Sequence, residues 1–408
     1  MSTIADDTRG GMRNVWIITA AMTVLAICYT MIIPFLPIYL LELGVPKADV
    51  ALWSGLVFGI TFLIAGIMAP IWGKIADNKG KKRMALRAGF AIAFCYVLIG
   101  LVTDQYQLLM GRALVGFANG FYPAAMTMVS LSVDEKQVGR ALGIFQTGLI
   151  LGNVIGPFLG GAVESVVGMR PVFYVSGVAV FIATLAVLFF VKEPKLHSAG
   201  ADGQSAEHPK STPLREDFKA VQQQPVLVRL LWIFFFMQCV IMMLQPILAL
   251  YVGDMQGTME GAAIVSGTIL SIGGLAGSLT TNLWVRLGER RGYFKTISYC
   301  MMGSGIVLLL QSLPVGIWWF GVLQVLIGSC IVGINPSLSA AVTLNTDPSF
   351  RGRMFGMTTT AQQFGSMVGP VFASIVSTYV GISYVFSITG LLLLYMGFQS
   401  RKLSKKHE

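Results

Sequence analysis

The sequence predicts an all-α integral membrane protein in which twelve transmembrane helices form two homologous six-helix bundles. Apolar residues make up 55% of the 408 residues and charged residues only 12%, about half the charged fraction of a soluble chain. The mean hydropathy is +0.72. Apolar stretches of about twenty residues, the length that a helix needs to cross a bilayer, recur along the whole chain. The two halves also match each other at a fixed offset.

The predicted spans are separated by short polar or charged loops. The first six cover about 15–41, 50–73, 85–103, 106–132, 140–163 and 171–191, and the second six cover about 228–253, 262–287, 294–312, 316–343, 353–380 and 382–399. The first apolar run is too long for a cleaved signal peptide. We therefore predict an N-terminal bundle at 1–191, a cytoplasmic linker with a short surface helix near 214–221 at 192–227, and a C-terminal bundle and tail at 228–408.

The net charge of +10 follows the predicted topology and does not indicate a nucleic-acid partner. With the N-terminus placed in the cytoplasm, 26 of the 29 Lys and Arg residues fall in cytoplasmic loops and tails, leaving Lys47, Arg112 and Arg170. Basic residues near the ends of spans are retained on the cytoplasmic side. We expect a multi-pass protein of the plasma membrane or bacterial inner membrane, with both termini cytoplasmic and the lipid bilayer as its surroundings.

The internal repeat predicts a transporter plan. Matches at an offset of 212 residues include Pro34 with Pro246, Tyr39 with Tyr251, and Trp72 with Trp284. Two parallel six-helix repeats are typical of carriers that bind substrate near the midplane and rock to alternate its access to the two sides. A channel needs no such duplication. The chain has no catalytic constellation, so we expect no enzyme.

The loop after the second predicted span, GKIADNKGKKR at 73–83, carries closely spaced glycines and charges. Its conformational residues are Gly73, Asp77, Gly80, Lys81 and Lys82. Glycines allow a tight turn and close helix approach, and Asp77 can meet basic side chains or a helix N-terminus as the bundles close. The alternative is a basic loop that serves only to set the topology.

This segment resembles the signature between the second and third helices of the major facilitator superfamily, and GERRG at 288–292 echoes it in the second half. The family usually has Arg where Asn78 stands, which weakens one expected ion pair. A second resemblance lies in the fifth span, where a glycine series is similar to the signature of proton-driven antiporters in this superfamily. Its residues are Gly148, Gly152, Gly156, Pro157, Gly160 and Gly161. Residues four apart share one helix face, so a packing role for these glycines is also expected.

Arg112 lies within the fourth span and resembles the family's helix-four Arg. A charge inside a membrane is costly unless it faces a cavity or a partner, so it indicates function, although snorkelling to the interface is the alternative. None of the nineteen acids lies in the middle of a span. We hypothesise that Glu164 or Asp77 takes part in proton coupling and that Arg112 modulates it. A solvated carboxylate at a helix end is the alternative for Glu164.

The candidate substrate residues are aromatic, amide and Met side chains in spans expected to face the cavity. Aromatic and Met side chains give adaptable apolar contact, and amides orient a ligand without demanding a charge. Helix packing is the alternative for each of them. They are Tyr29, Phe35, Asn119, Tyr122, Gln146, Gln238, Met242, Gln245, Asn335, Gln362 and Phe364.

The whole pattern resembles the twelve-span drug:proton antiporters, in particular the MdtG-like multidrug exporters. The resemblance implies proton-coupled efflux of hydrophobic or amphipathic drugs by alternating access, with small molecules and protons as partners. We expect the protein to be a monomer. A carrier for one sugar or organic anion, or a non-transporting membrane scaffold, remains open as an alternative. The five cysteines have no metal-like spacing and there is no phosphate-binding loop for ATP, so we expect no metal and no cofactor.

Overall fold

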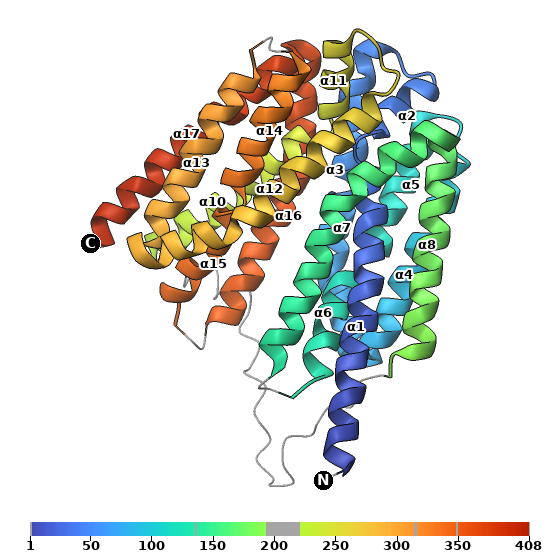
Figure 1. The fold of residues 1–408 in the computed structure, drawn as a ribbon, viewed down its shortest axis with the longest axis vertical. Helices are drawn as coiled ribbons and strands as arrows, with labels where there is room; N and C mark the ends of the chain where they lie inside the picture. Colours follow the sequence, from blue (N-terminus) through green and yellow to red (C-terminus); the bar gives the residue numbers. More distant parts are fainter. Residues whose placement is uncertain (1, 135–136, 193–220, 314–315, 348–349, 408) are drawn as a thin grey trace.

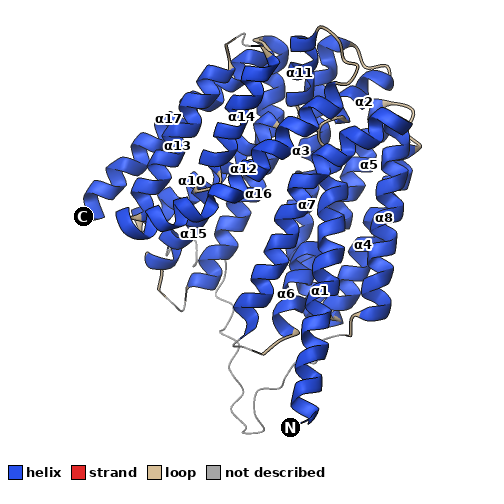
Figure 2. Ribbon diagram, viewed as in Figure 1, coloured by secondary structure: helices blue, strands red, loops and turns tan. Residues whose placement is uncertain are grey.

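The computed structural model is helical throughout the residues it describes, which are 2–134, 137–192, 221–313, 316–347 and 350–407 (Figure 1, Figure 2). The side chains at 2–10, 77, 78, 352 and 403–407 are outside this description. The first half comprises α1 (Ser2–Met31), α2 (Leu36–Glu42), α3 (Lys47–Lys79), α4 (Lys81–Gly100), α5 (Gln105–Ala118), α6 (Phe121–Leu131), α7 (Val138–Val167) and α8 (Met169–Phe190). The second half comprises α10 (Pro225–Leu244), α11 (Leu248–Gln256), α12 (Ala262–Arg291), α13 (Tyr293–Gln311), α14 (Ile317–Ile331), α15 (Ile334–Leu344), α16 (Arg351–Tyr379) and α17 (Ile382–His407). The predicted surface helix near 214–221 falls mostly outside the described residues.

Eleven helical segments of the described chain are long and apolar enough to cross a membrane, which confirms the membrane fold class. The remaining predicted span, 353–380, corresponds to α16, which is 29 residues long but has no stretch as apolar as those of the eleven segments. Its polarity has a structural reason, because Thr359, Gln362 and Gln363 line a cavity between the two bundles.

Four predicted spans are pairs of helices joined at a break, which the apolar runs did not reveal. The pairs are α1–α2, α5–α6, α10–α11 and α14–α15, the first and fourth spans of each half. Pro34 and Pro246 lie in two of these breaks and have no N–H to continue the helical hydrogen bonding. Gly120 adopts a φ of +131° between α5 and α6, a conformation that favours glycine.

The sequence repeat is also a repeat of contacts. The Tyr39 hydroxyl donates a hydrogen bond to the Ile99 carbonyl over 3.2 Å, and the Tyr251 hydroxyl donates to the Gln311 carbonyl over 3.1 Å. The donor and the acceptor of the second bond each lie 212 residues after those of the first. Each half therefore fixes its first broken span to its third span in the same way.

The two bundles meet where α3 packs against α16 and α7 packs against α12. At Gly55 an added Cβ would overlap the Pro370 carbonyl, and at Gly267 it would overlap the Pro157 carbonyl. These contacts are related by the internal repeat. Glycine is required at both places because the neighbouring backbone occupies the position of a side chain.

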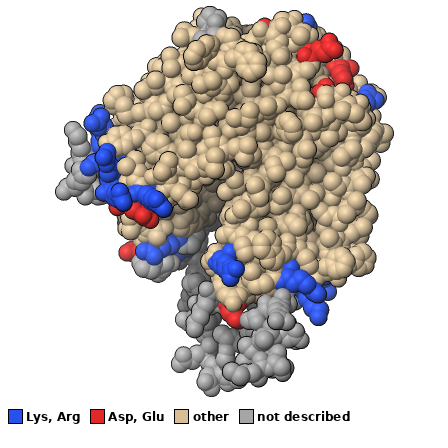
Figure 3. Space-filling view, in the orientation of Figure 1, with Lys and Arg blue, Asp and Glu red and all other residues tan. Residues whose placement is uncertain are grey.

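Away from these contacts the helices of the two bundles diverge. An added Cβ at Gly59 would lie 2.8 Å from an atom of α16, whereas one at Gly66 or Gly73, further along α3, has nothing within 4 Å. Gly143 and Gly356, near the beginnings of α7 and α16, are equally open. The bundles are thus closed at one face and open at the other, where Figure 3 shows a hollow between two lobes.

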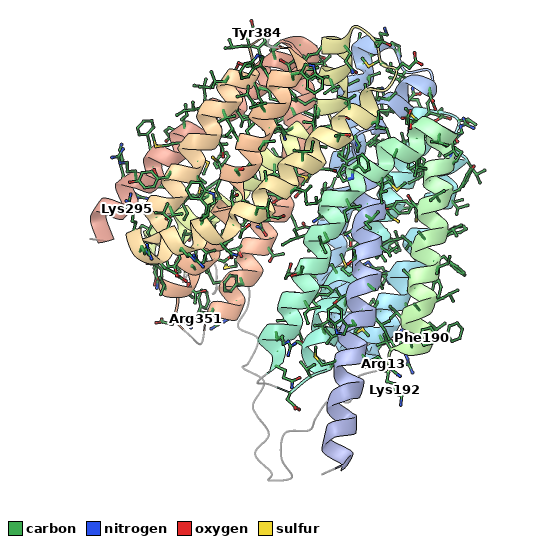
Figure 4. All side chains as sticks on the ribbon, in the orientation of Figure 1. Arg13, Phe190, Lys192, Lys295, Arg351 and Tyr384 are labelled. Carbon is green, nitrogen blue, oxygen red and sulfur yellow. The ribbon has the colours of Figure 1, made fainter. Side chains whose placement is uncertain are left out.

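Basic side chains gather at the open end, which we call the basic face. It includes the ends of α3 and α12 and the beginning of α16, with Lys79, Arg290, Arg291 and Arg351. Figure 4 places Arg13, Lys192, Lys295 and Arg351 toward this end and Tyr384 at the other, which we call the closed face.

Candidate functional site

A cavity of about 660 Å³ lies between the bundles on the basic-face side. Its walls come from α3, α4, the α5–α6 break, α6 and α16. Three of the predicted substrate residues, Asn119, Tyr122 and Gln362, line it, and Thr359 and Gln363 of α16 add to the polar part of the wall. Its volume falls within the range of about 300–1,000 Å³ that is usual for small-molecule sites.

The lining of this central cavity is nearly neutral. Among its described lining residues, Lys81 alone carries a charge, and the other polar groups are amides, hydroxyls, backbone groups and the Trp72 indole. Aromatic and Met side chains supply the apolar part. The wall can therefore orient a ligand by hydrogen bonds while most of the contact is apolar.

The α5–α6 break is held at the cavity wall by two side chains. Trp72 Nε1 donates to the Phe117 carbonyl over 2.8 Å, and Arg87 Nη2 donates to the Asn119 carbonyl over 2.9 Å. The Arg87 guanidinium stacks 3.6 Å from the centroid of the Trp72 ring. Together they satisfy carbonyls that the break leaves without helical partners. Sequence reasoning missed Arg87 because it counted this residue with the topology-setting basic loop.

Two predicted substrate residues are hydrogen-bonded to each other. Gln146 Nε2 of α7 donates to the Tyr122 hydroxyl of α6 over 3.0 Å. The Tyr122 ring also lies 5.8 Å from that of Phe145. The pair fixes the orientation of Tyr122 at the cavity.

Other predicted substrate residues lie away from the central cavity. Phe35 is fully buried and packs edge-on against Phe173, and Met242 is also buried. Asn335 is exposed on α15. Phe364 is 54% exposed and lines a second, smaller cavity.

Two predicted amides of the second half, Gln238 and Gln245, occupy packed positions. Gln238 of α10 lies beside Gly365 of α16, where an added Cβ would be 3.0 Å from the Gln238 Cβ. Gln245, in the α10–α11 break, buries its Oε1 without a hydrogen-bond partner among the described residues. Neither residue lines a cavity described here.

Arg112 is only 2% exposed and lies inside the N-terminal bundle. Its guanidinium is 5.7 Å from the Phe58 ring centroid and interacts electrostatically with the hydroxyls of Tyr29 and Tyr96. Within the described chain, Nε and Nη2 are buried without a hydrogen-bond partner. Thr61 Oγ1 donates to the Arg112 carbonyl over 3.2 Å, which ties α3 to α5. The side chain therefore does not snorkel to the membrane surface. Its charge is buried within the bundle, where an ionic partner would stabilise it strongly.

The glycine series of α7 forms two contacts. Four glycines receive the backbone and small side chains of α1: Gly148, Gly152, Gly156 and Gly160. Thr30 Oγ1 reinforces this joint by donating to the Gly152 carbonyl over 3.3 Å. Gly161 faces α12 instead, where an added Cβ would meet the backbone of Ala263 and Ile264. The series thus joins α1 to α7 and also helps to close the two bundles.

The loop motif between α3 and α4 lies at the basic-face mouth of the cavity. Gly73 and Lys81 line it, and Gly80 has a φ of +95° at the turn. Lys82 Nζ donates to the Leu188 carbonyl over 2.9 Å, near the end of α8. The Asp77 side chain falls outside the described residues.

Glu164 lies near the closed-face end of α7 and is half-buried. It interacts electrostatically with Glu42 at the end of α2, which in turn interacts with Arg170. Glu164 is three residues beyond Gly161, about one turn of α7. The described residues hold no group of three or more His, Cys, Asp and Glu side chains that could bind a metal ion.

Sequence comparison matches the family model of the Major Facilitator Superfamily at residues 18–310 and 261–401. The chain is 31% identical over 384 residues to the multidrug resistance protein MdtG of Proteus mirabilis, covering 94% of each chain. It is 30% identical over 389 residues to that of Citrobacter koseri, covering 95% of this chain and 94% of the relative.

Solved structures share the fold. The nucleoside transporter NupG superposes with a TM-score of 0.77 at 15% identity, covering 95% of this chain and 99% of the other. A bacterial homologue of the human lysosomal transporter Spinster, in an inward-facing and unoccupied conformation, gives a TM-score of 0.76 at 17% identity and covers 97% of both chains.

Proposed function

This chain belongs to the Major Facilitator Superfamily and is a multi-pass secondary transporter, and from that premise we propose that it exports hydrophobic or amphipathic drugs in exchange for protons. The relatives carry the name multidrug resistance protein, and their similarity runs over almost the whole chain. The observation that carries the proposal is the central cavity, which joins a mostly apolar wall to several neutral hydrogen-bonding groups. Such a wall suits varied amphipathic compounds better than one multiply charged solute.

Transport requires that the cavity change the face to which it opens. The glycine contacts of α3 with α16 and of α7 with α12 close one face, while the basic face is open. We place the basic face in the cytoplasm because Lys and Arg near span ends are retained there. The described arrangement is then the one that takes substrate from the cytoplasmic side, and rocking about the closed contacts would release it outside.

Proton coupling needs a group whose protonation changes during the cycle. The candidates are Glu164 near the closed face and Asp77 at the basic-face mouth, with Arg112 modulating them. Arg112 supports this role by its position, since a buried guanidinium with two unpartnered nitrogens responds strongly to any charge that approaches it.

We propose a monomer in the bacterial inner membrane or plasma membrane.

The test is transport by the purified protein in vesicles with the basic face outward and an interior made acidic. Accumulation of ethidium and of uncharged Nile red is followed by fluorescence, with protein-free vesicles as the control. We expect accumulation of both, mutual competition, and loss of accumulation when nigericin collapses the pH gradient.

Arg112→Ala separates coupling from binding in the same assay. We expect it to bind dye but to lose gradient-driven accumulation. Saturation by one metabolite, with no movement of dyes, would instead support a single-solute carrier. Absence of any protein-dependent movement across a chemically varied set would refute transport of drugs.

A further inference from the structure

Trp72 of α3 lines the central cavity with a ring whose position is fixed by two residues that do not line it. The Phe117 ring meets it at 80°, with 5.3 Å between the centroids, and the Phe117 carbonyl accepts a hydrogen bond from Trp72 Nε1 over 2.8 Å. The Arg87 guanidinium covers one face of the indole, 3.6 Å from its centroid. The indole is half-buried, so part of its surface stays open on the cavity side. A ligand in the cavity meets an aromatic surface that is already oriented.

Arg87 of α4 is held in place for this contact by the α5–α6 break. Its Nη2 donates to the Ala118 carbonyl over 3.2 Å and to the Asn119 carbonyl over 2.9 Å. An added Cβ at Gly120 would lie 3.3 Å from the same nitrogen, so the glycine leaves room for the guanidinium. Since a guanidinium is planar, it can donate to carbonyls and lie flat on a ring at the same time. Arg87 therefore fixes the Trp72 ring from behind the cavity wall.

The internal repeat provides a second tryptophan with the same hydrogen bond. Trp284 of α12 is the equivalent of Trp72 and is also half-buried. Its Nε1 donates to the carbonyl of Ser329, the equivalent of Phe117. The bond from the indole to the end of the neighbouring helix is thus common to both halves, and it has a structural role in each.

The surroundings of the two rings differ. Trp284 does not line the central cavity, and an added Cβ at Gly333 would overlap its side chain. The position equivalent to Arg87 holds Tyr299, which is exposed on α13. Among the described residues, an indole that is stacked on a guanidinium and lines the cavity is found in the first half only. Helix packing explains the hydrogen bond but does not require this additional arrangement.

A fixed aromatic surface in a cavity wall suits a ligand that carries a flat ring. Two flat rings gain dispersion contact over their whole faces, and such stacking accepts varied substituents because every aromatic system has a face. Asn119, Thr359 and Gln362 line the same cavity and can hydrogen-bond to the substituents of such a ring.

We propose that Trp72 is a ligand-binding residue that stacks on a flat aromatic ring of the substrate, and that Arg87 is a positioning residue that acts through Trp72. The substrates of this class are amphiphiles with a fused planar ring system, either cationic or uncharged. This inference rests on the proposed function, and it adds a substrate class and the residue that recognises it.

The test measures binding of ethidium and Nile red to the full-length protein in bilayer discs, with empty discs as the background. Four variants are compared: Trp72→Leu, Trp72→Phe, Trp284→Leu and Trp284→Phe. All four lose the indole hydrogen bond, whereas the Phe variants keep a flat aromatic face. We expect Trp72→Leu to raise the Kd of both dyes about tenfold and Trp72→Phe to stay within about threefold of wild type. Both Trp284 variants should stay within about twofold.

Three results would overturn the assignment of Trp72. They are an unchanged Kd in Trp72→Leu, an equal loss in Trp72→Phe, and an equal loss in Trp284→Leu, which would make the effect a general consequence of the lost hydrogen bond. Each of these leaves the proposed export intact, because wild-type protein still binds the dyes. Wild-type protein that binds neither dye would overturn the proposed drug export together with this inference.

Arg87→Lys tests the positioning role, because lysine keeps the charge and a donor for the carbonyls but loses the planar stack. We expect it to raise the Kd of both dyes about threefold in the wild-type background and to cause no further loss in the Trp72→Leu background, since coupled residues are non-additive. The same loss in both backgrounds, or no loss in either, would overturn the positioning role of Arg87.

The substrate class is tested with two competitors of ethidium, a naphthyl ammonium and its decahydronaphthyl counterpart, which match in carbon number and charge. We expect the flat naphthyl member to compete about threefold better with wild-type protein and to lose this advantage in Trp72→Leu. No preference for the naphthyl member, or a preference that persists in Trp72→Leu, would refute recognition of a flat ring by Trp72.

Discussion

Gly267→Ala should shift the transporter toward the arrangement that opens its closed face. The new methyl group would overlap the Pro157 carbonyl oxygen and lie 2.8 Å from the carbonyl carbon. Optimal contact needs about 3.5–4.0 Å, so α7 and α12 would have to separate by about 1 Å. Overpacking of this kind costs about 1–3 kcal/mol, and only the closed arrangement suffers it. The population ratio should therefore move by about 5–150-fold.

The assay is the distance between spin labels at Ser165 on α7 and Glu260 just before α12, both exposed near the closed face. Double electron–electron resonance on labelled Gly267→Ala should show a longer distance that is rare in the parent. Replacing Cys330, the one half-buried cysteine, by Ser limits background labelling.

Gly143→Ala is the matched control, because its added Cβ meets nothing within 4 Å. Both changes raise helix propensity by about 1 kcal/mol, so this contribution is common to the two variants. A distance distribution in Gly267→Ala identical to that of Gly143→Ala would refute the view that backbone contact at Gly267 holds the face closed.

Three further outcomes are expected. Trp72→Phe removes the hydrogen bond to the α5–α6 break and should lower the free energy of unfolding by about 0.5–1.5 kcal/mol, as should Trp284→Phe at the equivalent place; an effect in only one of the two would contradict equivalent roles. Arg112→Gln should reduce gradient-driven export at least tenfold while dye binding persists, and wild-type export would remove Arg112 from the coupling. Glu164→Gln should make export insensitive to the pH gradient if Glu164 carries the coupling proton, and normal proton-linked export would exclude it.

The repeat was predictable from the sequence because its matches fall on residues that fix helix packing. Trp72 and Trp284 match at an offset of 212, and their indole N–H groups donate to the carbonyls of Phe117 and Ser329, which differ by the same offset. Aromatic residues with a polar handle are constrained in both burial and partner, so they persist in both halves. The membrane fold class followed from hydropathy for a similar reason, since lipid admits few backbone arrangements.

The cavity could not be predicted in the same detail. Apolar runs do not reveal breaks such as Gly120, because a break inside protein keeps its hydropathy and changes only its hydrogen bonding. Arg87 looked like any loop charge, although its partners are two carbonyls at the break and the Trp72 ring. Phe35 is an aromatic residue of the kind that contacts ligands, yet it is buried and packs against Phe173. Composition gives the kinds of side chain in a site, and only helix rotation decides which of them reach it.

Departures from the repeat carry information that the repeat itself does not. The position equivalent to Arg112 in the second half is Gln324, 212 residues later, and its Oε1 accepts a hydrogen bond from Gln311 Nε2 over 3.0 Å. A neutral amide is therefore compatible with helix packing at this position, and its hydrogen-bond partner comes from its own bundle. The first half instead holds a guanidinium with two buried nitrogens unpartnered among the described residues, an arrangement that costs stability. We propose that the charge of Arg112, whose equivalent Gln324 is neutral, serves a transport cycle in which another charge approaches it or leaves it. Arg112→Gln gives the two halves the same residue at this position, and it is therefore the substitution that most directly tests whether Arg112 has a role in the proposed coupling beyond helix packing.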